Sequence, residues 1–279
     1  MITITPQELT FIINHIYAIS GIALDSGKKY LVETRLTPVI KELGLSTHME
    51  LYRKATADKT KQIDKKIIDA ISVNETLFFR DNGPFQLLQQ KIFPEVIDAR
   101  EQRKARTGKI PLRIWSAACS TGQEVYSVAI VLKEILPSIN NYQITLVGTD
   151  ISDAAVARAS SGKYNKFEIE RGMTGDKLRK YFTMSGGFWK IKDEIRAMAS
   201  FRKFNLMQPF TTLGKFDIIL CRNVAIYFNM EDKKNLFNRL AQSLEPDGYL
   251  IIGSTESLMG ICPRFIPKRH LKSTFYQLK

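Results

Sequence analysis

The sequence of 279 residues has few of the side chains that build metal and thiol sites. The cysteines are Cys119, Cys221 and Cys262, and the histidines are His15, His48 and His270. No two cysteines are close enough in sequence to form a CxxC pair, which favours reduced thiols over disulfides or a zinc site. The histidines are scattered and have no metal-ligand spacing. The sequence therefore predicts neither a metal site nor a catalytic histidine.

Long apolar runs are also absent. No stretch is long enough to span a membrane, and residues 1–6 lack the charged and apolar regions of a signal peptide. We therefore expect a cytoplasmic protein without membrane insertion.

Positive charge is abundant but unevenly distributed. The net charge is +13, yet residues 1–83 hold 11 basic and 10 acidic side chains, whereas residues 84–279 hold 30 and 18. Residues 158–203 carry 12 basic against 5 acidic side chains. A second basic segment, within 100–113, consists of Arg100, Arg103, Lys104, Arg106, Lys109 and Arg113 against Glu101. The excess fits a solvated surface or an acidic macromolecular partner.

The chain divides into a helical part and an α/β part. We expect helices near 5–20, 28–43, 47–57 and 60–71, with Pro38 kinking or breaking the second. From 112 onward strands and helices alternate, which predicts a Rossmann-like α/β fold with a parallel sheet and a final edge strand at 274–278. Short alternating pieces predict an inserted antiparallel β-subdomain at about 163–203. The expected domains are 1–83, helical, and 84–279, α/β with that insertion.

A loop of small residues follows the first strand of the α/β part, at 115–124 (WSAACSTGQE). It lacks the glycine and lysine pattern of a phosphate-binding Walker loop and the three glycines of a dinucleotide site. Glu124 at the start of the next helix would repel a pyrophosphate and suits a ligand with hydroxyl and ammonium groups. S-adenosylmethionine has both and carries no phosphate. Asp150, at the end of the next strand, fits its ribose hydroxyls.

Polar residues follow two further strands of the predicted sheet. Arg222 and Asn223 end the strand at 216–221, and Asn205 and Leu206 follow the piece at 201–204. Because ligands bind at the carboxyl ends of the strands in open α/β sheets, we expect these residues at the same edge as Asp150.

Three segments together resemble one family. Residues 74–80 (NETLFFR), 115–122 (WSAACSTG) and 221–228 (CRNVAIYF), in this order, closely resemble the CheR-type chemotaxis receptor methyltransferases. The resemblance extends over nearly the whole chain. It implies a class I S-adenosylmethionine-dependent methyltransferase that methylates glutamate side chains on the cytoplasmic helices of chemoreceptors and releases S-adenosylhomocysteine.

The resemblance also implies site residues. Those expected around the cofactor are Asn74, Thr76, Arg80, Glu124, Asp150, Asn205, Leu206, Arg222 and Asn223. Asp150 is expected on the ribose, Asn205 and Leu206 beside the adenine, and Arg222 and Asn223 nearer the methionine end. We interpret Arg80 and Tyr227 as the catalytic pair: Arg80 would orient a carboxylate and Tyr227 would donate a hydrogen bond near the reacting methyl group. Their alternatives are an interdomain salt bridge for Arg80 and a packed aromatic ring for Tyr227.

The expected partner is the cytoplasmic domain of a methyl-accepting chemoreceptor, bound by a monomer, with no nucleic acid. The family docks its receptor through the N-terminal domain, where Lys28 and Arg35 lie two helical turns apart. In some members the β-subdomain docks a short receptor C-terminal peptide. Two alternatives stay open: a nucleic-acid methyltransferase, although residues 205–210 (NLMQPF) lack the paired prolines of base-methylating enzymes, and a non-catalytic S-adenosylmethionine-binding signalling adaptor.

Overall fold

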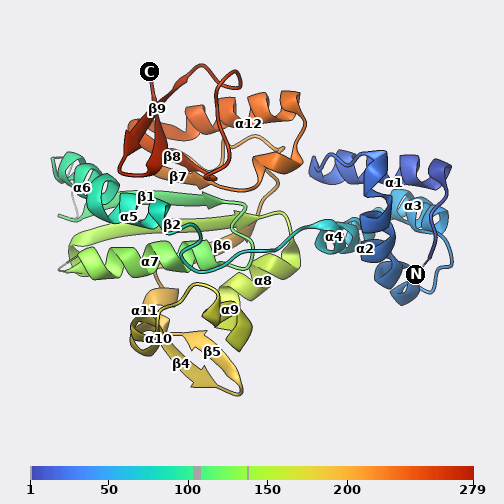
Figure 1. Ribbon diagram of the computed structural model, residues 1–279, viewed down its shortest axis with the longest axis horizontal. Helices are drawn as coiled ribbons and strands as arrows, with labels where there is room; N and C mark the ends of the chain where they lie inside the picture. The colour runs from blue at the N-terminus through green and yellow to red at the C-terminus, as the bar shows by residue number, and fades with distance from the viewer. Residues whose placement is uncertain (1, 103–107, 137) are drawn as a thin grey trace.

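The computed structural model describes residues 2–102, 108–136 and 138–279. Figure 1 shows a helical N-terminal domain beside a larger α/β domain, from which a small β-subdomain projects. Three apolar cores correspond to this arrangement: one inside the helical domain and one on each face of the large sheet. Arg103, Lys104 and Arg106 of the predicted basic segment lie outside the described residues.

The N-terminal domain is a bundle of four α-helices within residues 2–72. They are α1 (Pro6–Ser20), α2 (Lys29–Glu42, preceded by η1, Ser26–Lys28), α3 (His48–Ala57) and α4 (Gln62–Ile71). The expected start of α1 is confirmed: Thr5 and Glu8 cap each other, and Pro6 occupies the first turn. Of the kink or break expected at Pro38, the break does not occur, because α2 continues through this residue. Ile12, Leu36 and Ile67 are among the residues that close the core.

In the described part of the α/β domain, seven strands form a mixed sheet in the order β6-β2-β1-β7-β8-β10-β9. The strands are β1 (Ile110–Ala117), β2 (Tyr142–Asp150), β6 (Ala199–Lys203), β7 (Phe216–Cys221), β8 (Leu244–Ile252), β9 (Phe265–His270) and β10 (Ser273–Leu278). Strands β6, β2, β1, β7 and β8 are parallel neighbours, whereas β10 runs antiparallel to β8. The chain proceeds outward from β1 through β2 and then returns to the other side at β7, so the carboxyl ends of β1 and β7 flank a switch point, where open α/β sheets bind ligands.

Helices cover both faces of this sheet (Figure 1). The elements on one face are α5 (Gly83–Leu87), η2 (Leu88–Ile92), α6 (Phe93–Glu101), α7 (Gln123–Ile135) and α8 (Asp153–Ser161), with η3 (Ile139–Asn141) at its border. The other face carries α12 (Met230–Ser243), after η4 (Ala225–Tyr227). Alternation along β1 follows from this two-sided burial: Leu112 and Ile114 belong to the first core, Trp115 and Ala117 to the second.

A three-stranded antiparallel sheet forms the small subdomain, as predicted. Its elements are β3 (Lys163–Tyr164), α9 (Lys166–Glu170), α10 (Gly175–Tyr181), β4 (Phe182–Ser185) and β5 (Phe188–Ile191), followed by α11 (Asp193–Arg196). The expectation that the piece at 199–204 also belongs to this sheet is wrong. That piece is β6, which pairs in parallel with β2 at the edge of the main sheet. An edge strand is half-exposed, so its alternating pattern resembles that of a small antiparallel strand.

The closing strand is confirmed at Ser273–Leu278, but its place at the edge is wrong. It lies between β8 and β9, and β9 forms the edge. The sequence of β9 (FIPKRH) contains Pro267 and three basic residues, and most of it is exposed. Proline and charge are what edge strands carry to avoid further pairing, and they also make such a strand resemble a loop.

Two arginines of the basic segment stabilise the fold. The buried Arg100 side chain pairs with Asp217 at 2.5 Å and with Asp247 at 2.6 Å. These carboxylates raise the pKa of Arg100 above its ordinary value. Arg113 donates to the carbonyl oxygens of Leu213 and Lys215. These two cations are therefore committed to internal partners.

Candidate active site

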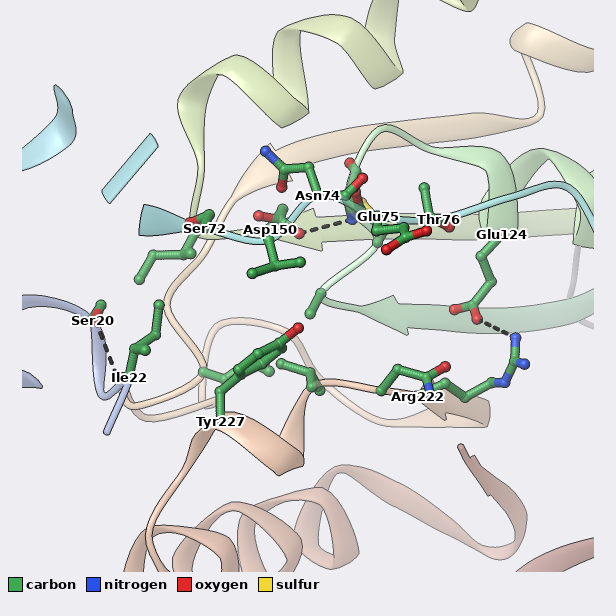
Figure 2. A pocket seen from close by; sticks show the side chains of 18 of the residues that line it. Ser20, Ile22, Ser72, Asn74, Glu75, Thr76, Glu124, Asp150, Arg222 and Tyr227 are labelled. Atoms are coloured by element: carbon green, nitrogen blue, oxygen red, sulfur yellow. Dashed lines mark hydrogen bonds and ion pairs between the residues drawn. The ribbon is translucent and has the colours of Figure 1, made fainter. Parts of the chain in front are cut away.

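A cavity lies at the switch point, between the carboxyl ends of β1, β2 and β7 and the N-terminal domain (Figure 2). Every site residue named from the sequence lines it: Asn74, Thr76, Arg80, Glu124, Asp150, Asn205, Leu206, Arg222, Asn223 and Tyr227. The structure brings these distant segments together around one cavity. Their individual chemical roles remain predictions.

The loop after β1 forms one wall in an unusual backbone conformation. Ala118, Ser120 and Gly122 all have left-handed φ angles of 61°, 50° and 94°. For a residue with a Cβ this conformation costs free energy, so other contacts must hold it. The Cys119 N–H donates to the Thr149 carbonyl, and the Ser120 N–H donates to the Asp150 carboxylate at 2.8 Å. The end of β2 thus fixes the loop.

Asp150 is the most deeply placed acid of the cavity, with 6% of its surface exposed. Besides Ser120, the Ser152 N–H donates to its carboxylate, at 3.0 Å, and Ser152 itself caps α8. Burial raises the pKa of Asp150, against the lowering effect of these N–H groups. Each carboxylate oxygen keeps a further lone pair, so Asp150 can still accept from two hydroxyl groups of a ligand.

Arg222 occupies the other side of the cavity floor, and its side chain is 1% exposed. It pairs with Glu124 at 2.8 Å and with Asp81 at 2.8 Å, and it donates to the Arg80 carbonyl at 2.9 Å. A buried cation needs such partners to offset its lost hydration. Figure 2 shows the Glu124 pair at the cavity wall. Glu124, which also accepts from Ser116, is thus an ion-paired acid and not an isolated one.

The interdomain segment 74–80 crosses the cavity. The Ser120 hydroxyl donates to the Asn74 carbonyl, and one Arg80 N–H donates to the Glu75 carbonyl at 3.2 Å. The interdomain salt bridge considered for Arg80 is not observed among the described residues. The guanidinium therefore keeps donors for a ligand. Thr76 also faces this space.

Tyr227 rises from η4, and its hydroxyl points into the cavity (Figure 2). Burial raises the pKa of Tyr227, while the nearby positive charge of Arg80 partly opposes the shift. The phenol is therefore protonated at neutral pH and can donate a hydrogen bond. The Cys119 thiol, which also lines the cavity, has its pKa raised by burial and is neutral there.

The remaining predicted residues are held by hydrogen bonds within the chain. Asn205 donates to the Ile19 carbonyl and accepts from the Met207 N–H. Arg239 donates to the carbonyl of the buried Leu206 at 2.7 Å. Asn223, with φ 57°, donates its N–H to Glu256.

Two N-terminal residues, Ser20 and Ile22, line the cavity although no sequence signal marks them. Ser20 ends α1 and Ile22 follows it, and the next residue, Ala23, donates its N–H to the Tyr227 carbonyl. On the opposite side, Asp69 of α4 accepts from the Ser152 hydroxyl at the start of α8. The helical domain therefore closes the cavity at two points. Contacts between the two domains place Ser20, Ile22 and Asp69, and such contacts leave no local pattern in the sequence.

The donor set fits one ligand class. A buried carboxylate faces a hydroxyl-binding position, apolar side chains such as Leu206 and Phe228 can take an aromatic ring, and Arg80 can take a carboxylate. The loop offers no lysine for a phosphate, and two acids stand beside it. This fits a nucleoside joined to an amino acid, as in S-adenosylmethionine.

Comparison with known families gives the same result. Residues 74–271 match the model described as CheR methyltransferase, SAM binding domain. Residues 7–72 match CheR methyltransferase, all-alpha domain. The chain belongs to the CheR methyltransferase family. Its second domain is therefore an S-adenosylmethionine-binding methyltransferase domain.

Relatives match over the full length. The chain is 37% identical over 286 residues to the chemotaxis protein methyltransferase of Vibrio parahaemolyticus, covering 100% of this chain and 99% of the relative. It is 38% identical over 243 residues to chemotaxis protein methyltransferase 1 of Pseudomonas aeruginosa, covering 85% of each. In the described parts of the chain, no helix combines the length and apolarity needed to cross a bilayer.

The predicted ribose contact can be tested at Asp150. We expect Asp150→Asn to weaken S-adenosylmethionine binding about 10- to 100-fold, because hydrogen bonds to a charged group contribute about 1.5–3 kcal/mol each. Calorimetry would measure the dissociation constant. Because the pKa of Asp150 is raised, wild-type affinity should fall on acidification at a higher pH than an ordinary aspartate would give, and the variant should lose this dependence.

Asp153→Asn is the matched control, since Asp153 pairs with Lys203 outside the cavity. Equal affinity in both variants would contradict the ribose role of Asp150.

Proposed function

We propose that this protein transfers the methyl group of S-adenosylmethionine to glutamate side-chain carboxylates of chemoreceptors, forming glutamate methyl esters and S-adenosylhomocysteine. One observation carries the proposal: Arg80 and the Tyr227 hydroxyl line the same cavity as Asp150 and the loop after β1, which we assign to the cofactor. The relatives, which are chemotaxis protein methyltransferases, support the choice of receptor.

The cavity suits an acceptor that needs no general base. A glutamate with a pKa of about 4.3 is already ionised at neutral pH. No histidine stands among the described lining residues, and Tyr227 is protonated. When bound, the cofactor supplies an electrophilic methyl group on its sulfonium. The chain's own work is to align the acceptor oxygen with that carbon and to exclude water.

Arg80 and Tyr227 are the residues we assign to that alignment. Arg80 orients a carboxylate, of the acceptor or of the cofactor, and Tyr227 donates a hydrogen bond near the reacting methyl group. As the methyl group passes to the acceptor, the carboxylate loses its charge. A single guanidinium can hold it without pairing so strongly that it resists transfer.

The nucleic-acid alternative fits less well. Asn205 would have to recognise a base, yet its amide contacts Ile19 and Met207. Arg100 and Arg113, which contribute to the basic excess, are bound to internal partners. A non-catalytic adaptor differs only in lacking transfer, so the same assay separates all three functions.

The decisive assay incubates the protein with methyl-labelled S-adenosylmethionine and either chemoreceptor cytoplasmic fragments or nucleic acid. We expect label in the receptor, released as methanol by mild base, as glutamyl methyl esters require. Label in nucleic acid would favour the rival enzyme. Cofactor binding without any transfer would favour the adaptor.

The catalytic pair is tested by substitution. With saturating cofactor we expect Tyr227→Phe to lower kcat on the order of 10- to 100-fold, since a donor aimed at developing charge contributes a few kcal/mol. Arg80→Ala should lower kcat/KM by a similar factor, because it removes a charge-assisted contact. Tyr142→Phe, at the opposite end of β2, is the control. Wild-type turnover in both cavity variants would show that these roles are wrong.

Receptor docking is proposed on the exposed face formed by Lys28 and Arg35. Lys28 ends η1 and Arg35 lies on α2; both are exposed. Ile22, which lines the cavity, precedes Lys28 by six residues in the chain. Receptor methylation helices are acidic, which gives charge complementarity.

Reversing both charges, Lys28→Glu and Arg35→Glu, should raise the KM for receptor about tenfold or more at low salt and spare cofactor affinity. Receptor titrations at two ionic strengths would measure this. The control is Arg53→Glu with Lys54→Glu on α3, which changes the net charge equally on exposed residues that do not line the cavity. Equal effects from both pairs would exclude the Lys28 face.

A further inference from the structure

Tyr164, in the first strand of the β-subdomain, contacts both walls of the cavity without lining it. Its hydroxyl donates to the Thr121 carbonyl at 2.9 Å, within the left-handed loop after β1. Its ring packs edge-on against Phe78 of the interdomain segment, with 4.9 Å between centroids. The side chain is completely buried. One residue of the subdomain thus links the two segments that carry Ser120 and Arg80.

The interdomain segment 74–80 depends on packing against the β-subdomain because it has no backbone hydrogen bonds of a helix or sheet. Residues 73–77 belong to neither helix nor strand. Phe78 is fully buried, and Phe182 of β4 meets its ring at 5.4 Å. A Cβ added at Gly172 would lie 2.0 Å from the Phe78 carbonyl oxygen, so the two backbones touch there. The subdomain therefore forms the surface on which this segment rests.

A peripheral ion pair reinforces the same joint. Arg171, beside Gly172, pairs with Glu75 at 2.7 Å, and this contact lowers the pKa of Glu75. The pair is exposed and weak by itself. The buried contacts of Tyr164 carry most of the coupling.

We propose that Tyr164 is a positioning residue for cofactor binding: through it, the β-subdomain holds the loop 118–122 and the segment 74–80 at the spacing the cofactor requires. This rests on the proposal that the cofactor occupies this cavity, and it requires nothing about the methyl acceptor. In Tyr164→Phe the packing remains, but the Thr121 carbonyl loses its buried donor. The loop can then relax from its left-handed conformation, and the cofactor must restore it on binding.

The test compares Tyr164→Phe with Tyr249→Phe in the full-length protein. Tyr249 of β8 is also buried, and its hydroxyl donates to the Glu95 carboxylate of α6; neither residue lines the cavity. Both variants lose one hydrogen bond of a buried side chain, so both should unfold at lower temperature. We expect only Tyr164→Phe to raise the dissociation constant for S-adenosylmethionine, about tenfold, with the KM for the cofactor rising likewise and kcat at saturation retained.

Wild-type affinity in Tyr164→Phe, or equal losses in both variants, would overturn the proposal. If Tyr164→Phe does not fold, Phe182→Leu takes its place, because the Phe182 ring of β4 packs on both Phe78 and Tyr164. Phe182→Leu should weaken cofactor binding severalfold while kcat at saturation is retained. An unchanged cofactor affinity in Phe182→Leu would equally overturn the proposal. Wild-type cofactor affinity in both Asp150→Asn and Arg80→Ala would instead show that the premise is wrong and that the cofactor does not occupy this cavity.

Discussion

The buried guanidinium of Arg222 is the interaction on which the site depends. It joins the end of β7 to Glu124 at the start of α7 and to Asp81 and the Arg80 carbonyl of the interdomain segment. Burying a cation costs free energy unless its partners are well placed. The buried position of Arg222 therefore requires β7, α7 and the interdomain segment to lie in their observed positions. The segment that bears Arg80 is thereby fixed to the sheet edge, although it has no regular structure of its own.

The strained loop after β1, on the opposite wall of the cavity, is likewise held by contacts from other elements. Ala118 and Ser120 keep left-handed backbones because Thr149 accepts the Cys119 N–H and Asp150 accepts the Ser120 N–H. The close packing of α8 contributes too: a Cβ on Gly122 would lie 2.9 Å from the Ala159 Cβ. This geometry turns the loop towards the cavity and leaves room for a ligand beside the backbone. The strained loop after β1 is therefore held in place by contacts from β2 and α8.

These contacts explain which features the sequence could predict. Asp150, Arg222 and Asn223 follow strands whose apolar runs are plain, and parallel strands bring their carboxyl ends to one edge. Residues placed by contacts between domains have no local signal. Asp81 meets a partner 141 positions away, and Ser20 lines the cavity beside Ala23, which is hydrogen-bonded to Tyr227 of η4. The sequence places β6 in the small subdomain and gives no sign of β9, because half-exposed or charged edge strands have weak patterns.

For the proposed reaction, the cavity faces a problem of selectivity: it must present one carboxylate to a methyl donor while its own acids stay unmodified. Glu124 is paired with Arg222, and Asp150 accepts two backbone N–H groups. A carboxylate whose charge is already engaged is a poorer nucleophile than one held by a single guanidinium with its second oxygen available. The hydrogen bonds that build the cofactor site are thus also the means by which the enzyme would avoid methylating itself. Under the proposed function, the acceptor would react because it arrives in the cavity without such partners.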